Sequence, residues 1–523
     1  MAAKALRRLG NNFPTLLPLL WFNAFILIYL SGCGGVIQKN RKNVYRPDRP
    51  EINLRQEDGN QLKVYGAADL CETGVQLQGP VVYQFLDGER VPVVSNLNRY
   101  GNTEGLGGGI VTGAIVDSYI KLPLEAAVDW DLNKIVRPMP AGPLQVVSAG
   151  SPLKVCRPGG DYPEDSWEGI ALSALQVVDQ TTRFVEGVPG LAAIDPLQLL
   201  VTPKIVDEIR VTNAREDKPE LIRLYQGNNA AYLSGLFEVD SLLLLGELEG
   251  ERISEAHLWE APFVVAHEFS HHIFKTLAKA SASWRLKSVQ DAVLYQHIHG
   301  PRFNYVVDPR QGKYSVVMGA WNEGFADLLA WISLGRPKLE GMGIRFLERM
   351  RDPASPRLGS VVFKSLTQTR WDAFLSRPVD DEIAGGSGRD TIFSDIHTIG
   401  AVLAWGFQVL VTEDRVEHTD KELAAMLIRW VNEVFRSQVD DLGPDEMMKS
   451  ILSQMVSAVE PTGQLTARQC AAMVATFPAF IKVKNFRLGF AEEPDQALQW
   501  SCTDSDSSSN FWSPNPIQQV GMP

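Results

Sequence analysis

Three residues with clear chemical potential, His267, Glu268 and His271, form an H-E-x-x-H string. On an α-helix, residues four apart share one face, so the two imidazoles could bind one zinc ion together. Glu268 would then lie beside the remaining coordination position, where a carboxylate can take a proton from a zinc-bound water. The string therefore predicts hydrolytic zinc chemistry.

The residues around the string predict a buried helix. Pro262 stands where a helix would begin, a favoured place for proline. Apolar residues surround the polar triplet, namely Phe263, Val264, Val265, Ala266, Phe269, Ile273 and Phe274. Polar side chains on a buried helix are costly unless they are paired or bound to metal. This context favours a metal site over an accidental triplet on a surface helix.

A third ligand is expected, because catalytic zinc sites usually have three protein ligands. The stretch 319–327 reads G-A-W-N-E-G-F-A-D and predicts a second buried helix that presents Glu323 to the metal. Asn322 and Asp327 could orient His271 and His267, since zinc-bound imidazoles usually need such partners. Alone, Glu323 could equally be a solvated helix carboxylate, and its two polar neighbours favour the ligand role.

The strings V-V-A-H-E-F-S-H and G-A-W-N-E-G-F-A-D resemble the zinc signature of the thermolysin-like and fungalysin-like metalloendopeptidases, the gluzincins. The resemblance covers roughly residues 165–500. It implies zinc held by His267, His271 and Glu323, with Glu268 as the general base. It also implies a two-lobe peptidase fold and a protein or peptide substrate.

Three weaker matches follow the same family pattern. Asn229 and Ala230 lie in a stretch that resembles the edge strand that aligns the substrate. Tyr314, nine residues before Glu323, and His397 match the groups that stabilise the oxyanion.

One departure from the family pattern concerns calcium. Phe263 stands where some of these enzymes have an acidic calcium ligand, so a need for Ca²⁺ is left open.

Two other functions remain open. An aminopeptidase on the same zinc scaffold would need residues that capture the substrate amine, and the sequence has no clear G-x-M-E-N string. A lipoprotein with a vestigial zinc lobe could instead bind envelope components without catalysis. The presence of every catalytic residue type argues against the vestigial interpretation.

The N-terminal residues predict export. Lys4, Arg7 and Arg8 precede an apolar run, Phe13–Leu30, that ends in Leu-Ser-Gly-Cys33. This ending resembles a bacterial lipobox, which implies cleavage before Cys33 and its acylation. An uncleaved transmembrane anchor is the alternative. The resemblance implies a lipid-anchored envelope protein, and glycine rather than aspartate after Cys33 resembles outer-membrane sorting.

Charge and cysteine content agree with export. Residues 1–32 carry three basic residues and no acidic one, so their removal would change the net charge from −12 to −15. This charge argues against nucleic-acid binding. Four further cysteines, Cys71, Cys156, Cys470 and Cys502, predict two disulfides with three possible pairings. Their positions favour Cys71–Cys156 and Cys470–Cys502, with free buried thiols as the alternative.

The chain is too long for a single core, so several segments are expected. Short apolar runs separated by turns predict strands before residue 160, and amphipathic spacing predicts helices at 421–435, 445–459 and 465–475. The fold class is α+β. The expected segments are a signal peptide (1–32), a polar tether (33–62), a β-sandwich (63–160), an α+β catalytic lobe (161–335), a helical lobe (336–500) and a disordered tail (501–523).

Overall fold

The computed structural model describes most of the chain between residues 78 and 503. Cys33, Cys71, Cys156, the expected signal peptide and tether, and all of the expected tail after residue 503 lie outside this part. The described ranges are 78–86, 89–96, 101–102, 105–106, 110–129, 134–135, 139–140, 145–153, 166–191, 193–212, 220–226, 229–233, 240–246, 258–280, 309–339, 351–358, 362–375, 393, 396–413, 416–437, 443–484, 487–491 and 500–503.

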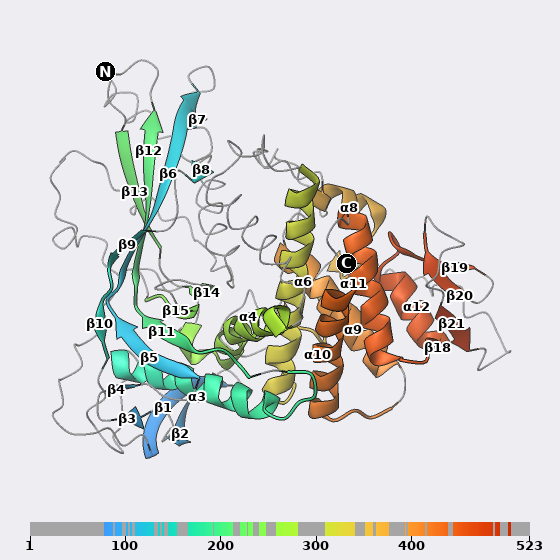
Figure 1. Cartoon of the computed structure of the whole chain (residues 1–523), viewed down its shortest axis with the longest axis horizontal. Helices are drawn as coiled ribbons and strands as arrows, with labels where there is room; N and C mark the ends of the chain where they lie inside the picture. Colours follow the sequence, from blue (N-terminus) through green and yellow to red (C-terminus); the bar gives the residue numbers. More distant parts are fainter. Residues whose placement is uncertain are drawn as a thin grey trace, which may run out of the picture.

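The fold is mixed α+β, as the sequence predicts, with eight α-helices and several sheets in the described part (Figure 1). None of the described helices is long and apolar enough to cross a membrane. The helices are α3 (Trp167–Val185), α4 (Pro262–Ala280), α6 (Pro309–Ser333), α8 (Gln368–Leu375), α9 (Ile396–Thr412), α10 (Asp420–Arg436), α11 (Pro444–Val459) and α12 (Ala467–Thr476), with a 3₁₀ turn, η5 (Leu258–Glu260).

Two mixed sheets lie before the helical part of the chain. A five-stranded sheet has the order β10-β5-β11-β15-β14, and a six-stranded sheet is built around β13-β12-β6-β7, with β8 and β9 also paired to β6. These strands are β5 (Val111–Val116), β6 (Tyr119–Asp129), β7 (Lys134–Ile135), β8 (Met139–Pro140), β9 (Gln145–Ser148), β10 (Ser151–Pro152), β11 (Leu197–Val201), β12 (Lys204–Thr212), β13 (Glu220–Gln226), β14 (Ala230–Leu233) and β15 (Asp240–Leu244).

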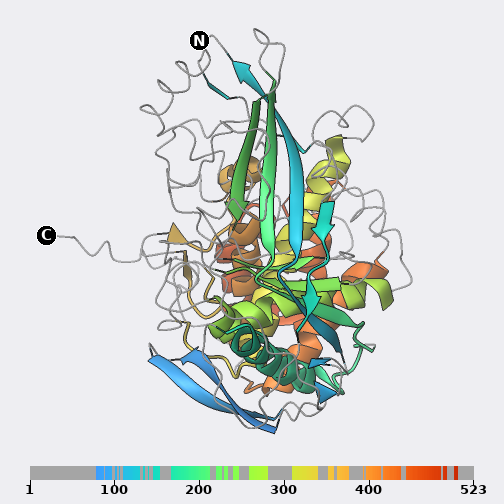
Figure 2. The ribbon, with the colours of Figure 1, turned by 90° about the vertical axis from the view of Figure 1, so that its left-hand side faces the viewer.

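Two neighbouring segments of the chain pass from the five-stranded sheet into the six-stranded sheet, and both bend where they leave the first sheet. β5 continues into β6, and β11 continues into β12, with parallel pairing on both sides of the bend. Asp117 and Thr202 lie at the bend with positive φ angles of 57° and 47°. Figure 2 shows β6, β12 and β13 as long strands that extend away from the helices.

The strand pairing crosses the boundary that we expected at residue 160. β5 and β6 belong to the segment predicted as a separate β-sandwich, yet they pair with β11 and β12 of the following segment. Parallel strands can pair across a long connection, and here that connection includes α3. The smaller hairpins before this point are β1 (Gln78–Leu86) with β2 (Glu89–Asn96), and β3 (Gly101–Asn102) with β4 (Gly105–Leu106).

The helices α4 and α6 pack together and against one large apolar core that extends from α3 to the C-terminal helices. α9 crosses α6 closely at Gly400 and Gly324. A methyl group on Gly400 would lie only 2.7 Å from Glu323 Cβ. Glycine at this crossing therefore allows α9 to approach the backbone that carries Glu323.

The C-terminal part contains α10–α12 and a four-stranded sheet of order β18-β21-β20-β19. α10 and α12 each begin with a complete capping box, at Thr419 and Thr466. The predicted disulfide between Cys470 on α12 and Cys502 on β21 is confirmed. The remaining strands are β16 (Arg357–Leu358), β17 (Val362–Phe363), β18 (Gln464–Thr466), β19 (Ile481–Lys484), β20 (Arg487–Phe490) and β21 (Trp500–Thr503).

Candidate metal centre

The H-E-x-x-H residues lie in the interior of the protein, on α4. His267 and Glu268 are completely buried and His271 is 1% exposed. The apolar residues that precede and follow them on α4 belong to the large core. This burial excludes the surface-helix interpretation of the string.

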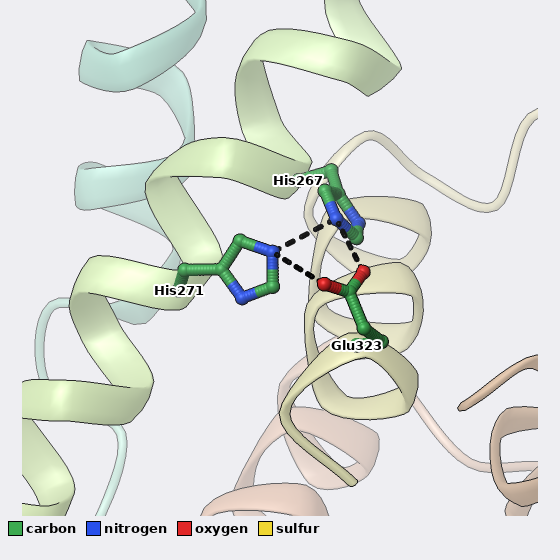
Figure 3. A group of neighbouring side chains, drawn as sticks. All are labelled: His267, His271 and Glu323. Carbon is green, nitrogen blue, oxygen red and sulfur yellow. Dashed lines mark hydrogen bonds and ion pairs between the residues drawn. The ribbon is translucent and has the colours of Figure 1, made fainter. Parts of the chain in front are cut away.

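Glu323 on α6 completes a group of three converging side chains (Figure 3). His267 Nε2 lies 3.0 Å from His271 Nε2 and 3.3 Å from Glu323 Oε2. His271 Nε2 lies 3.7 Å from Glu323 Oε1. Around a tetrahedral zinc ion, two ligand atoms lie about 3.3 Å apart, given metal–ligand bonds near 2.0–2.1 Å. The buried group could therefore hold a metal ion.

Asp327 sets the tautomer of His267. The Oδ1 atom of Asp327 lies 3.0 Å from His267 Nδ1, and a carboxylate there accepts a hydrogen bond from the ring N–H. The other nitrogen, Nε2, then has its lone pair available and faces the centre of the group. Carboxylate–histidine pairs of this kind orient metal-binding imidazoles.

His271 has a different environment. Burial lowers the pKa of His271 to about 4, against the opposing charge of Glu323. The imidazole is therefore neutral at pH 7, which is the form that binds metal. The Asn322 amide is close enough to oppose this shift. Its Oδ1 and His271 Nδ1 are, however, without a hydrogen bond in the described part, so orientation of His271 by Asn322 stays a prediction.

The carboxylates of α6 are held in their ionised form. Burial alone would raise the pKa of Glu323, but His397, His271 and Arg351 hold it well below its usual range. Burial also acts to raise the pKa of Asp327, and Arg351 and His267 lower it instead. Ionised carboxylates and neutral imidazoles are the states in which these residues bind a cation.

Glu268 contacts the edge of the five-stranded sheet. Its Oε2 atom accepts a 2.9 Å hydrogen bond from the backbone N–H of Tyr232 on β14. β14 is the last strand of its sheet, and Asn229 gives its carbonyl to Leu245. Because backbone groups alternate in direction along a strand, Ala230 and Tyr232 present theirs on the outer side. Of the predicted substrate-aligning residues, Ala230 thus lies on the strand that holds Glu268, and Asn229 directly precedes it.

The structure places the side chain of only one of the two predicted oxyanion-stabilising residues. His397 lies in the first turn of α9, and its Nε2 is 3.7 Å from Glu323 Oε1, so the structure brings it to the group. Tyr314 lies on α6, nine residues before Glu323. The side chain of Tyr314 is not among the described parts of the structure.

His272, one helical turn after Glu268 on α4, joins a second buried polar cluster. Its ring nitrogens contact the Asp195 carbonyl at 2.7 Å and Asp240 Oδ2 at 3.0 Å. The Tyr232 hydroxyl donates to the same Asp240 oxygen at 2.8 Å, and Lys275 pairs with the other oxygen. This cluster fixes β14 against α4, and with it the N–H that binds Glu268.

Two parts of the site were missed by sequence reasoning. Arg351 contacts both carboxylates of α6, but no motif surrounds it and a single arginine carries little sequence signal. The N–H of Tyr232 is a backbone group, which no residue pattern identifies. A strand followed by a buried metal-binding helix could have suggested such a contact.

Comparison with known protein families and with curated proteins returned no match for this chain. The functional argument therefore rests on the site itself.

Proposed function

We propose that this chain is a zinc endopeptidase. The observation that carries the proposal is the convergence of His267, His271 and Glu323 from two buried helices, with Glu268 directly beside a ligand and bonded to a sheet edge. Two imidazoles and one carboxylate form a donor set typical of catalytic zinc, with one position left for a reacting group.

In this proposal, a bound zinc ion would polarise the scissile carbonyl and acidify a water molecule. Glu268 takes the proton from the attacking water and later delivers it to the leaving amine. Tyr232 N–H keeps the Glu268 carboxylate in place at the sheet edge. A hydrogen bond thus joins the proposed base to the strand that would align the substrate.

The remaining roles follow from position. His397, close to Glu323, would donate a hydrogen bond to the oxyanion, with Tyr314 assisting. Asn229 and Ala230 would pair with an extended substrate as an added strand. The outward direction of the Ala230 backbone groups supports this arrangement.

The resemblance to thermolysin-like enzymes extends the proposal to the whole molecule. A mixed α+β part that carries α4 and α6, followed by mainly helical elements, fits a two-lobe peptidase. We propose further that acylation of Cys33 anchors the enzyme outside the cytoplasm in a bacterial envelope. Globomycin, which blocks cleavage of lipobox precursors, should then leave a chain that is larger by its first 32 residues.

The test is incubation of the purified chain with an unstructured protein and with peptides, with and without a zinc chelator. We expect internal cleavage that stops on chelation and returns with zinc. Acetylation of the peptide N-terminus separates the alternatives, because an aminopeptidase needs the free amine and an endopeptidase does not. Zinc binding without any cleavage would favour the non-catalytic lipoprotein.

A further inference from the structure

Arg351 is a buried arginine at the metal-binding group, 24 residues after Asp327 in the chain and 1% exposed. Its Nε donates to both oxygens of Asp327 at 3.0 Å. Its Nη2 lies 2.9 Å from Asp327 Oδ1 and donates to Glu323 Oε2 at 2.7 Å. One guanidinium therefore joins a candidate metal ligand to the carboxylate that orients another ligand.

The guanidinium also contacts the ring of His267. Nη2 lies 3.2 Å from His267 Nε2 and 3.5 Å from Nδ1. Because a guanidinium can only donate, Nη2 reaches the same His267 nitrogen that belongs to the metal-binding group.

The charges at the group explain why a cation is needed there. Three carboxylates, Glu268, Glu323 and Asp327, lie together in the interior with at most 2% exposure. Arg351 supplies one positive charge in direct contact with Glu323 and Asp327, the buried Lys364 acts electrostatically on Asp327, and a divalent metal would supply two more positive charges. Buried charge without a partner is strongly unfavourable. Among the described residues, Arg351 is thus the cation that contacts both α6 carboxylates directly when metal is absent.

We propose that Arg351 is a positioning residue that stands in for the metal's charge and keeps the ligands assembled before metal binds. Arg351 and the metal would then stabilise the same carboxylates as alternative cations. The inference rests on the proposed metal site, but not on peptide hydrolysis. It predicts that the chain folds without metal because of Arg351, unlike small metal domains whose folding requires the ion.

The segment after Arg351 is built to keep it in place. Ala354 N–H binds Asp352 Oδ1 at 2.9 Å, and Ser355 N–H binds the Asp352 carbonyl at 3.1 Å, which forms a tight turn. The buried Lys364 donates to the same carbonyl. These contacts fix the backbone next to Arg351, so its guanidinium is presented to α6 by an ordered support.

The experiment compares thermal unfolding midpoints of wild type and Arg351→Met, each with a chelator and with excess zinc. Met retains much of the side-chain length without charge. We expect the midpoint of the chelated variant to fall by at least 5 °C more than that of the zinc-loaded variant. A variant that folds only with zinc would support the inference in its extreme form.

Arg370→Met is the matched control. The guanidinium of Arg370 binds the backbone carbonyls of Phe363 and Ser365 and stacks on Phe393. Its loss should lower both midpoints equally. Equal shifts for Arg351→Met, or no shift in either condition, would overturn the inference.

Asp327→Asn in the Arg351→Met background gives a second, metal-free test. Removal of one negative charge should recover part of the lost midpoint in the chelated protein, even where the single variant does not fold. No recovery would overturn the role of charge. Should wild type show no zinc-dependent shift, the proposed function fails, while this metal-free comparison still decides the role of Arg351.

Discussion

Asp327, completely buried on α6, determines the chemistry of His267 without being a ligand. It directs the Nδ1 proton of His267 away from the centre and leaves Nε2 to face His271 and Glu323. Glu268 is fixed in a comparable way by a backbone N–H. At the scale of single residues, Asp327 and the Tyr232 N–H thus each hold one polar side chain of the site in place.

Glu268→Gln should abolish most of the peptidase activity while zinc affinity is retained. Glutamine keeps the size of the side chain but cannot accept the proton, and loss of a general base typically lowers the rate about 10²–10⁴-fold. The measurements are the hydrolysis rate of an internally cleaved peptide and the zinc content. Glu417→Gln, an exposed carboxylate on the same chain, is the control. Wild-type turnover in Glu268→Gln would contradict the assignment.

The low pKa of His271 gives a pH prediction for the chelated protein. In the unfolded chain histidine takes up a proton near pH 6.5, whereas burial delays this step to about pH 4 in the folded protein. Between these values the unfolded state binds more protons, so the free energy of unfolding decreases as pH falls. The loss should reach about 3 kcal/mol, since one pKa unit corresponds to about 1.4 kcal/mol.

Denaturant unfolding between pH 7 and pH 4 measures this effect, with a chelator present throughout. His271→Asn should remove this part of the pH dependence. His418→Asn, away from the group, should leave it unchanged. An identical slope in His271→Asn and wild type would show that other groups dominate the acid response.

At the scale of elements, three segments that are distant in the sequence meet at the site. α4 provides His267, His271 and the proposed base Glu268, α6 provides Glu323, and α9 brings His397. The close crossing of α6 and α9 depends on Gly324 and Gly400. β14, which the Asp240 cluster holds against α4, contacts Glu268 through the Tyr232 N–H.

Gly400→Ala should weaken zinc binding, although Gly400 touches no metal. The added methyl group would lie 2.7 Å from Glu323 Cβ and 2.8 Å from the Ala320 carbonyl, so α6 and α9 would have to separate. Displacement of a ligand's support typically costs about 10–100-fold in metal affinity. Chelator competition measures the affinity. Gly489→Ala, where nothing lies within 4 Å, is the control. Unchanged affinity in a folded Gly400→Ala protein would refute the argument.

Local sequence signals predict several helices and the three residues that converge in the candidate metal group. The i, i+4 spacing of His267 and His271 and the polar neighbours of Glu323 identify all three members of the group. Amphipathic spacing predicts α10, α11 and α12 within a few residues. Arg351 could not be predicted from the sequence. Its role depends on a tertiary contact with Asp327, and no periodic pattern surrounds it in the sequence.

The strand partners were harder to predict for a related reason. The apolar runs identify β5 and β11 as strands, but their pairing joins Val111 to Leu197 across α3. A sequence pattern states where a strand is and not which strand lies beside it. The expected boundary at residue 160 therefore divides two sheets that the chain builds jointly.

At the scale of the whole molecule, a disulfide cross-links the C-terminal sheet to the C-terminal helices. The disulfide joins α12 to β21 across a separation of 32 residues. Both cysteines lie in or against the large core. The bond thus fastens the last described strand to the helical part of the chain.

Replacement of Cys470 and Cys502 by serine should lower stability without a change in zinc affinity. Closing a loop of this length contributes about 3–4 kcal/mol through the unfolded state. Denaturant midpoints and chelator competition on the same preparation give both quantities. A parallel loss of zinc affinity would contradict this prediction and would show that the cross-link also supports α6.

The joint sheets also impose an order on biosynthesis. A ribosome releases β5 long before β11 and β15. However, β5 joins the five-stranded sheet by pairing with β11, which in turn pairs with β15. Until β15 emerges, the early strands have unsatisfied edges that favour aggregation. Pairing between distant segments is also slow compared with helix formation. The nascent N-terminal region thus cannot complete the five-stranded sheet before β11 and β15 are synthesised.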